Sequence, residues 1–146
     1  MHGDVRYNCT IIDLHDRSVI ASITDRHITS ELAIRTLQKA LESQRPAEDG
    51  LILHSDQGSQ YTSKAFTGFC ESVHVLQSMS KAGYPYDNAP MERYFNTLKN
   101  ECTKLYEFRE ESALYQTVEE FAYVTYNHMR PHSYNGYKTP FEARCA

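Results

Sequence analysis

The chain has 146 residues, 40% of them hydrophobic and 23% charged, which fits one globular domain with a buried core. No apolar run approaches the ~20 residues of a membrane span, and the polar start MHGDVRYN is not a secretory signal, so we expect a cytoplasmic protein. The net charge of −4 excludes a strongly basic domain that holds nucleic acid by its charge alone. Four scattered cysteines without a C-x-x-C pair favour free thiols over a zinc ribbon or a disulfide framework.

The N-terminal third predicts a β-hairpin and a helix. Tyr7–Leu14 and Val19–Thr24 are rich in residues that favour strands, and a polar turn separates them. We therefore expect the two strands to pair antiparallel. Thr29 or Ser30 can cap a helix that runs to about Ser43, because its apolar residues recur at helical spacing.

The middle of the chain predicts two strands with a helix between them. Leu51–Leu53 is a continuous apolar run that indicates a buried strand. This strand places Asp56 at its C-terminal edge, where open α/β sheets carry their sites. A helix should run from Ser63 to about Val73, and Val75–Met79 should be a short strand.

A loop and a helix follow. Ser80–Asn88 is rich in Gly, Pro, Asn and Asp, and its few apolar anchors predict the least ordered internal segment of the chain. Pro90 then suits the first position of a helix, which should reach about Leu105 with Glu92 in its first turn. Lys99 follows Glu92 by two helical turns, so both side chains should leave the helix on one face.

The last part predicts a helix from about Ser112 to Met129 and an extended, looped tail over residues 130–146. His128 and His132 lie four residues apart, a spacing that can bind a metal. Pro131 breaks the helix between them, so we favour a surface or phosphate-contacting role over metal ligation.

Asp56 and Glu92 are the candidate catalytic residues and metal ligands. Carboxylates that converge on a pocket bind Mg²⁺ or Mn²⁺, which take oxygen ligands and keep positions open for phosphate and water. Two such ions clamp the attacking and leaving oxygens of a phosphoryl displacement, and Lys99 is placed to meet a phosphate. Each residue also has a plainer interpretation: S-D-x-G is common turn chemistry, an acidic residue suits the first helical turn, and a lysine on a helix face is usually just solvated.

Three motifs carry a family resemblance. HSDQGSQY from His54, DNAPMERYFNTLKNE from Asp87 and YNHMRPHSYNGYKTPFEA from Tyr126 resemble the integrase catalytic core of insertion-element transposases of the IS-three group, relatives of retroviral integrases in the DDE superfamily. The resemblance covers nearly the whole chain. In that family 35 residues separate the second and third catalytic acids, and 35 residues lie between Asp56 and Glu92.

The resemblance implies an α/β, ribonuclease-H-like fold, a mixed sheet flanked by helices, in a single domain over residues 1–146. It implies DNA cleavage and strand transfer with Mg²⁺ or Mn²⁺ as the cofactor. The protein would act as a homo-oligomer on DNA and would be nucleoid-associated when acting. Its DNA specificity would reside largely in an upstream helix-turn-helix segment that is absent from this chain. The expected DNA contacts are Lys81, Asn88, Lys99, Arg130 and His132. Asn88 has the alternative of capping its helix, and Arg130 that of packing against the last helix.

One part of the family pattern has no match. There the first catalytic Asp lies on the first core strand, upstream of the strand that corresponds to Tyr7–Asp13. Asp4 falls in the turn entering that second strand and Asp13 at its far end, so neither matches. We therefore expect a core without its first strand, in which the edges of the two neighbouring strands are left unpaired beside a gap. We also expect that the isolated chain neither cleaves nor joins DNA.

Three functions compete on this sequence. The first is a transposase core that cleaves and joins DNA, and the second is a nuclease of the same fold that cleaves without joining. A strand-transfer assay on pre-cut ends separates these two. The third is an inactive fragment that acts at most as an interaction module; an upstream coding segment for a strand with an Asp would argue against it.

Overall fold

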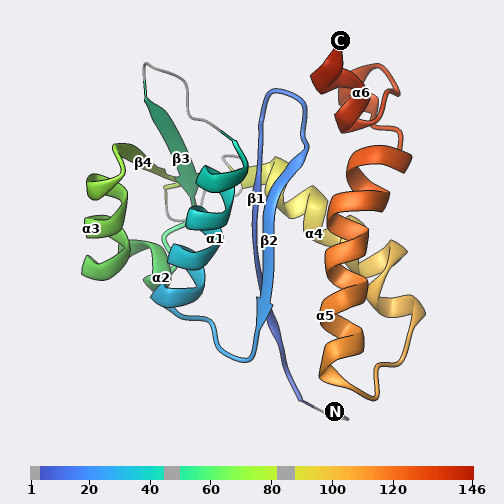
Figure 1. The fold of residues 1–146 in the computed structure, drawn as a ribbon, viewed down its shortest axis with the longest axis horizontal. Coiled ribbons are helices and arrows are strands. Elements are labelled where there is room, and N and C mark those ends of the chain that lie inside the picture. Colours follow the sequence, from blue (N-terminus) through green and yellow to red (C-terminus); the bar gives the residue numbers. More distant parts are fainter. Residues whose placement is uncertain (1–3, 45–49, 82–87) are drawn as a thin grey trace.

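The computed structural model describes residues 4–44, 50–81 and 88–146 (Figure 1). The elements follow in the order β1 (Tyr7–Ile12), β2 (Val19–Asp25), α1 (Ser30–Ser43), β3 (Leu51–Ser55), α2 (Ser59–Thr62), α3 (Lys64–Ser72), β4 (Val75–Met79), α4 (Ala89–Glu101), η2 (Thr103–Leu105), α5 (Glu111–Glu120), η3 (Phe121–Met129), η4 (Ser133–Asn135) and α6 (Pro140–Cys145). No helix in these ranges has the length and apolar character to span a membrane. The predicted loop Ser80–Asn88 lies mostly outside the described residues, so its mobility stays a prediction.

The strands form two separate two-stranded sheets. β1 and β2 pair antiparallel, with Cys9 opposite Ile23, and β3 and β4 pair parallel, with Leu53 opposite Gln77. Among the described strands no ladder connects β1 to β3; α1 packs against β1 and β2 and also against α2 and α3. The predicted hairpin and the predicted break in the sheet between β1 and β3 are both confirmed.

Side-chain caps fix where two of the helices begin. The Thr29 hydroxyl accepts a hydrogen bond from the Leu32 amide at 3.1 Å, and the Ser63 hydroxyl accepts one from the Phe66 amide at 3.1 Å. Each bond satisfies an amide that the first helical turn leaves without a partner. α1 and α3 therefore start where the sequence predicts, whereas α2 has no counterpart among the predicted elements.

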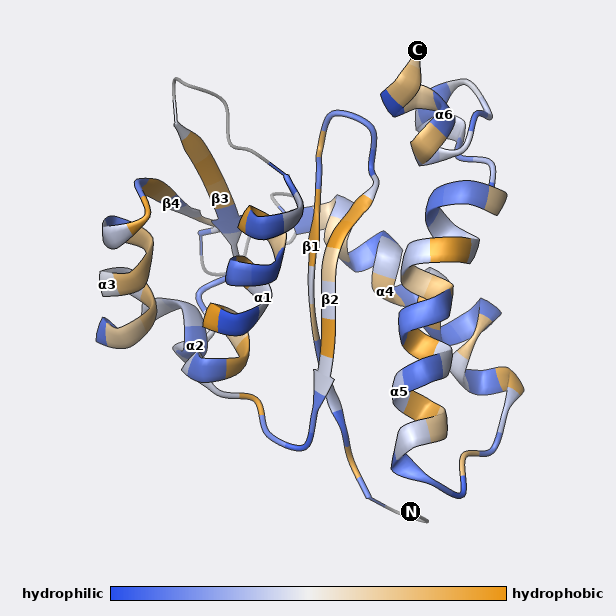
Figure 2. Ribbon diagram, viewed as in Figure 1, coloured by the Kyte–Doolittle hydropathy of each residue, from blue (hydrophilic) through white to orange (hydrophobic). Residues whose placement is uncertain are grey.

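The β1–β2 hairpin lies between two hydrophobic cores, and Figure 2 shows hydrophobic residues along both of its strands. Ile11 packs against one core and Ile12 against the other, because successive side chains of a strand point to opposite faces. The first core joins α1, α3 and β4 through Ala33, Leu37, Phe66, Cys70 and Val75. The second joins β2, α4, α5 and η3 through Val19, Tyr94, Leu98, Cys102, Val118, Phe121, Ala122 and Tyr126.

The β3–β4 sheet is covered on one face only. Ile52 is 69% exposed and its register partner Leu76 is 67% exposed, while Val75 on the other face is buried against α1 and α3. The prediction that the apolar run at β3 is a fully buried strand is therefore wrong for Ile52. A continuous apolar run does not reveal that helices cover a single face.

The C-terminal residues fold into η4 and α6, so the predicted extended tail is wrong in this part. The Thr139 hydroxyl accepts the Glu142 amide at 3.2 Å and the Glu142 carboxylate accepts the Thr139 amide at 3.4 Å, which is a capping box. Pro140 occupies the first helical turn, where its missing amide costs nothing. This Thr-x-x-Glu pattern is a helix signal, and the Pro and Gly content of the segment obscured it.

α6 is fastened to the turn between β1 and β2. Arg144 Nη1 lies 2.7 Å from Asp16 Oδ2 and 3.1 Å from Asp13 Oδ2, and the Asn135 amide group donates to the Asp16 carbonyl at 2.7 Å. Asp16 is only 1% exposed. Burial by itself raises the pKa of Asp16, but hydrogen bonds from the Ser18 hydroxyl and amide and from Arg144 outweigh burial and hold that pKa below its ordinary value.

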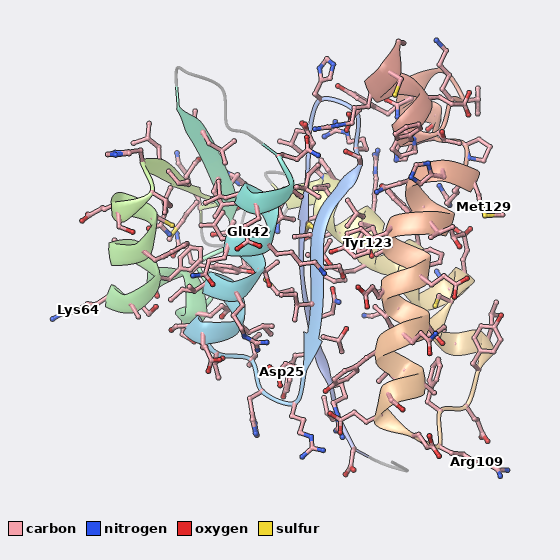
Figure 3. All side chains as sticks on the ribbon, in the orientation of Figure 1. Asp25, Glu42, Lys64, Arg109, Tyr123 and Met129 are labelled. Carbon is pink, nitrogen blue, oxygen red and sulfur yellow. The ribbon has the colours of Figure 1, made fainter. Side chains whose placement is uncertain are left out.

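Two tyrosine hydroxyls should respond oppositely to removal. Tyr94→Phe is expected to leave the free energy of unfolding unchanged or to raise it by up to about 1 kcal/mol, because the Tyr94 hydroxyl is buried without a hydrogen-bond partner among the described residues. Tyr123→Phe is expected to cost about 1 to 2 kcal/mol, since the Tyr123 hydroxyl accepts the Ser22 amide at 2.8 Å (Figure 3). Urea denaturation measures the free energy of unfolding of both variants. Equal losses would contradict the view that the Tyr94 hydroxyl is unpaired and the Tyr123 hydroxyl is hydrogen-bonded.

Acid should weaken the link between the hairpin and α5. Glu111 accepts hydrogen bonds from Arg26 and Arg6, and these bonds, with those from Arg26 contributing most, lower the pKa of Glu111 from 4.5 to about 2. Its contribution to stability is complete above the unfolded-state pKa of 4.5 and is lost as the pH falls toward 2. The destabilisation by Glu111→Gln, measured by urea unfolding, should therefore shrink as the pH falls below 4.5. Glu110→Gln is the control, and a pH-independent Glu111→Gln effect would contradict the link.

Candidate active site

Asp56 directly follows β3, and its side chain is exposed. Its Oδ1 accepts the Gly58 amide at 2.8 Å, which orients the carboxylate and leaves Oδ2 without a hydrogen bond to any described residue. A Cβ at Gly58 would lie 2.9 Å from Asp56 Oδ1, so any larger residue there would displace this carboxylate oxygen. The position at the C-terminal end of the strand agrees with the prediction.

The ends of β3 and β4 are fastened by polar side chains that the sequence did not single out. The His54 ring lies 2.9 Å from the Ser78 hydroxyl through Nδ1 and 2.9 Å from the Ser80 hydroxyl through Nε2. The Gln57 side-chain amide donates to the Ser80 carbonyl at 3.0 Å. Lys81 follows at once and is exposed. These contacts fix the strand end that carries Asp56, and the alternation of polar residues after an apolar run is the signal that could have indicated them.

Glu92 lies in the first turn of α4 and Lys99 in its last, and both are exposed. Tyr94 and Leu98 are buried in the second core and fix the rotation of the helix, so Glu92 and Lys99 share a solvent-facing side as predicted. In Figure 1, α4 runs from the side of β3 and β4 behind the hairpin toward α5. Asn88 stands at the N-cap position but makes no capping hydrogen bond, which does not support the capping alternative.

The donor chemistry of Asp56 and Glu92 fits a hard divalent cation. Both are exposed carboxylates, and Mg²⁺ binds proteins through one or two carboxylates while keeping several waters. Within residues 4–44, 50–81 and 88–146, no three His, Cys, Asp or Glu side chains are grouped closely enough to hold a metal ion. The pair therefore suits an ion whose other ligands are water and substrate phosphate. That the two carboxylates share one ion stays a prediction.

Arg130 and His132 have partners within the protein. Arg130 Nη2 lies 2.9 Å from Glu101 Oε2, and Arg130 Nε donates to both oxygens of the same carboxylate. This pairing favours the structural alternative for Arg130. His132 is half-buried and packs against Tyr126 at 6.2 Å between ring centroids, whereas the His128 ring lies 4.4 Å from Phe141. The two histidines have separate neighbours, which agrees with the preference against a shared metal.

Neither Asp13 nor Asp4 forms a hydrogen bond or an ion pair with the described residues of this site. Asp13 lies in the turn after β1, where Oδ1 accepts the His15 amide at 2.9 Å and Oδ2 pairs with Arg144. Its role in the structure is to hold α6. Asp4 is exposed ahead of β1 and makes no hydrogen bond with the described residues.

Known families and relatives match this chain over most of its length. The integrase core domain family matches residues 2–85 and a second integrase core domain family matches residues 68–140. A protein of insertion element IS600 from Shigella sonnei is 37% identical over 92% of this chain, the transposase of IS904 from Lactococcus lactis 34% over 92%, and transposase InsF of IS3A from Escherichia coli 35% over 92%. The chain spans about half the length of these relatives, namely 49%, 53% and 46%.

Solved retroviral structures share the fold. The simian T-cell lymphotropic virus intasome in complex with the PP2A regulatory subunit B56 gamma aligns with a TM-score of 0.80 at 21% identity, over 99% of this chain and 50% of that chain. The HTLV-2 integrase catalytic core domain in complex with magnesium aligns at 0.71 and 20% identity, over 95% and 90%. The BIV integrase catalytic core domain aligns at 0.69 and 17%, over 97% and 87%. The predicted ribonuclease-H-like fold is confirmed, and with the family match over residues 2–85 it follows that this chain belongs to the integrase core domain family, alongside bacterial insertion-element transposases.

Proposed function

We propose that this chain is the catalytic core of a transposase that cleaves a phosphodiester at the end of an insertion element and joins the freed 3′-hydroxyl to target DNA. The observation that carries the proposal is the exposed Asp56 at the end of β3, followed after 35 residues by the exposed Glu92 in the first turn of α4. Paired carboxylates on a rigid strand end and a rigid helix suit the metal-dependent transfer of phosphoryl groups.

Asp56 and Glu92 would hold Mg²⁺ or Mn²⁺. When bound, the ion supplies Lewis-acid charge that offsets the negative charge of the reacting phosphate and lowers the pKa of a bound water. Asp56 is oriented for this by the Gly58 amide, which uses one carboxylate oxygen and leaves the other for the ion. Lys99, on the Glu92 side of α4, would contact a neighbouring phosphate as a point charge.

DNA contacts are proposed for Lys81, Asn88, Lys99, Arg130 and His132. Lys81 lies just beyond the end of β4 and Asn88 just before α4, so both border the segment that links the two carboxylate-bearing elements. Arg130 would have to exchange its pairing with Glu101 for a phosphate, which makes its contribution the weakest of the five. The net charge of −4 supports a division of labour in which other segments or subunits supply most of the DNA affinity.

We further propose that the active form is a homo-oligomer on DNA. Support comes from the relatives: one neighbour is an intasome and another is a trimeric form of a catalytic core domain in complex with magnesium. Two element ends must be held together for joining, and a symmetric assembly of identical cores supplies two equivalent sites.

Metal binding tests the proposal without an assay of activity. Mn²⁺ added to the ¹⁵N-labelled chain should broaden the amide resonances around Asp56 and Glu92 before any others, because the unpaired electrons relax nearby nuclei. Asp56→Asn or Glu92→Gln should weaken this effect at both positions, while Glu71→Gln, an exposed acidic residue on α3, should not. Broadening that the two variants leave unchanged would refute the metal site. Hydrolysis without joining on pre-cut DNA ends would favour the nuclease alternative.

A further inference from the structure

We propose that Arg17, Arg93 and His132 form a phosphate-binding site that takes a backbone phosphate of DNA beside the reacting phosphodiester. The inference deepens the proposed function and rests on it. The three side chains come from the β1–β2 turn, from the start of the second turn of α4 and from the residue just before η4, and they line one hollow together with Pro90, Tyr126 and Tyr134. Their spacing in the sequence gives no hint of this convergence.

Arg17 is held in place by a side-chain contact with η4 and by the backbone of its own turn. Its guanidinium carbon lies 4.0 Å from the centre of the Tyr134 ring, which is a cation–π contact. Its backbone is left-handed, with φ 65°, and its amide donates to the Asp13 carbonyl at 2.7 Å. The bond from Asn135 to the Asp16 carbonyl keeps η4 against the same turn. A guanidinium stacked by its face keeps its edge N–H groups for an anion.

His132 offers a proton donor toward the hollow. Its Nδ1 accepts the Tyr134 amide at 3.2 Å, so in the neutral ring the proton resides on Nε2. The backbone around it is fixed, because the His132 amide donates to the Lys138 carbonyl at 3.1 Å and the Tyr137 amide donates to the His132 carbonyl at 2.9 Å. The ring is therefore presented in one orientation, with Nε2–H as its free donor.

The positive charges at this hollow lack partners. Arg17 and Arg93 form no ion pair among the described residues, whereas Arg130 nearby is paired with Glu101. Burial lowers the pKa of His132 most, and the positive charges of Arg130, Arg17 and Arg93 near the ring lower that pKa further. In a chain with a net charge of −4, two unpaired arginines beside one histidine mark a place for an anion.

The size of the hollow and the geometry of the arginine side chains indicate which anion fits. The hollow has a volume of about 30 Å³, more than the roughly 10 to 15 Å³ that one water molecule needs on the same measure, so it has room for a phosphate oxygen. Arginine forks match the oxygens of a phosphate. Arg93 is the residue after Glu92, so a phosphate held here lies beside the turn that carries the candidate catalytic carboxylate. The ligand class is a phosphodiester of the DNA backbone, and a free phosphate ion shares its chemistry.

The test compares Arg17→Gln and Arg93→Gln with Arg109→Gln. Arg109 is exposed and lies at the opposite end of the molecule from α6 (Figure 3), so its exchange removes the same charge elsewhere. Binding of the whole chain to a labelled duplex is measured between about 50 and 200 mM salt. Each site variant should reduce the slope of log affinity against log salt by about 0.9, the value for one lost phosphate contact, while Arg109→Gln should keep the wild-type slope. Wild-type slopes in the site variants, or an equal change in Arg109→Gln, would overturn the site.

A second measurement follows the His132 ring by NMR during titration with inorganic phosphate and, separately, with the duplex. The groups that face this ring are Arg17, Arg93 and Arg130, with Tyr126 and Tyr134. Phosphate or duplex should shift the ring resonances and raise the pKa of His132 in wild type and in Arg109→Gln, but not in Arg17→Gln. No response to either ligand would overturn the site. If the wild-type chain binds no duplex, the division of labour proposed above accounts for that result and the proposed function still stands, while the site itself is then decided by phosphate alone: an Arg17-dependent response of the His132 ring supports it, and no response overturns it.

Discussion

Exchange of Asp56 for Asn, in a chain extended by an upstream strand that bears an aspartate, is expected to lower metal-dependent cleavage of an element end about a thousandfold. Asn keeps an oxygen for the Gly58 amide but loses the charge that a divalent cation requires. A rate loss of this size corresponds to about 4 kcal/mol of transition-state stabilisation, in the range measured for the loss of one charge-stabilising group. Glu92→Gln should have a loss of the same order, measured as single-turnover cleavage of a labelled DNA end.

The control for this prediction is Glu107→Gln, which removes an exposed carboxylate from the connection between η2 and α5 and should leave the rate unchanged. Without the added strand, the 146-residue chain is expected to show no cleavage or joining. Metal-dependent cleavage by this chain alone, lost on Asp13→Asn or Asp4→Asn, would instead identify a substitute ligand and contradict the expectation.

Arg144→Met is expected to lower the free energy of unfolding by about 2 to 4 kcal/mol. Asp16 is 1% exposed, and removal of the guanidinium leaves a buried carboxylate with only the Ser18 donors. Breaking a buried pair on one side typically costs more than 3 kcal/mol, and the 30% exposure of the Arg144 side chain moderates this value. Urea or thermal denaturation with circular dichroism measures the loss.

Arg130→Met is the matched control, because Arg130 also pairs with a carboxylate but both partners are more exposed. Its expected cost is at most about 1 kcal/mol. The double variant Asp16→Asn with Arg144→Met should recover part of the loss, since no unpaired charge then remains buried. Equal losses in Arg144→Met and Arg130→Met would show that the pair at Asp16 has no special weight.

Elements whose signals are local could be predicted from the sequence. β4 spans Val75–Met79 as predicted, and the caps at Thr29 and Ser63 begin α1 and α3 as predicted. In each case residues within about four positions decide the conformation. α6 follows the same rule, because the capping box of Thr139 is a local helix signal. The Pro and Gly residues of this segment indicated a loop instead, which is why the helix was not predicted.

Features that depend on distant residues could not be predicted. Exposure of Ile52 depends on which face of the β3–β4 sheet α1 and α3 cover, and no local pattern encodes that choice. α5 continues into the π-helical η3, where the Arg130 amide donates to the Thr125 carbonyl at 2.8 Å.

Some residues of the candidate site could be predicted from the sequence and others could not. Asp56 and Glu92 are candidates from spacing and family resemblance, and their positions at a strand end and in a first helical turn could be predicted. The neighbouring Arg17, Arg93 and His132 could not, because the three lie on separate segments that meet only in the folded chain.

The contact between Arg144 and Asp16 also orders events while the chain is being made. The two residues are 128 positions apart, so a ribosome that adds about 5 to 20 residues per second incorporates Arg144 roughly 6 to 25 s after Asp16. Throughout that interval the turn between β1 and β2 has no guanidinium to match its carboxylate, and the carboxylate stays hydrated. Asp16 therefore reaches its paired, buried state only after α6 has been synthesised and has emerged from the ribosome.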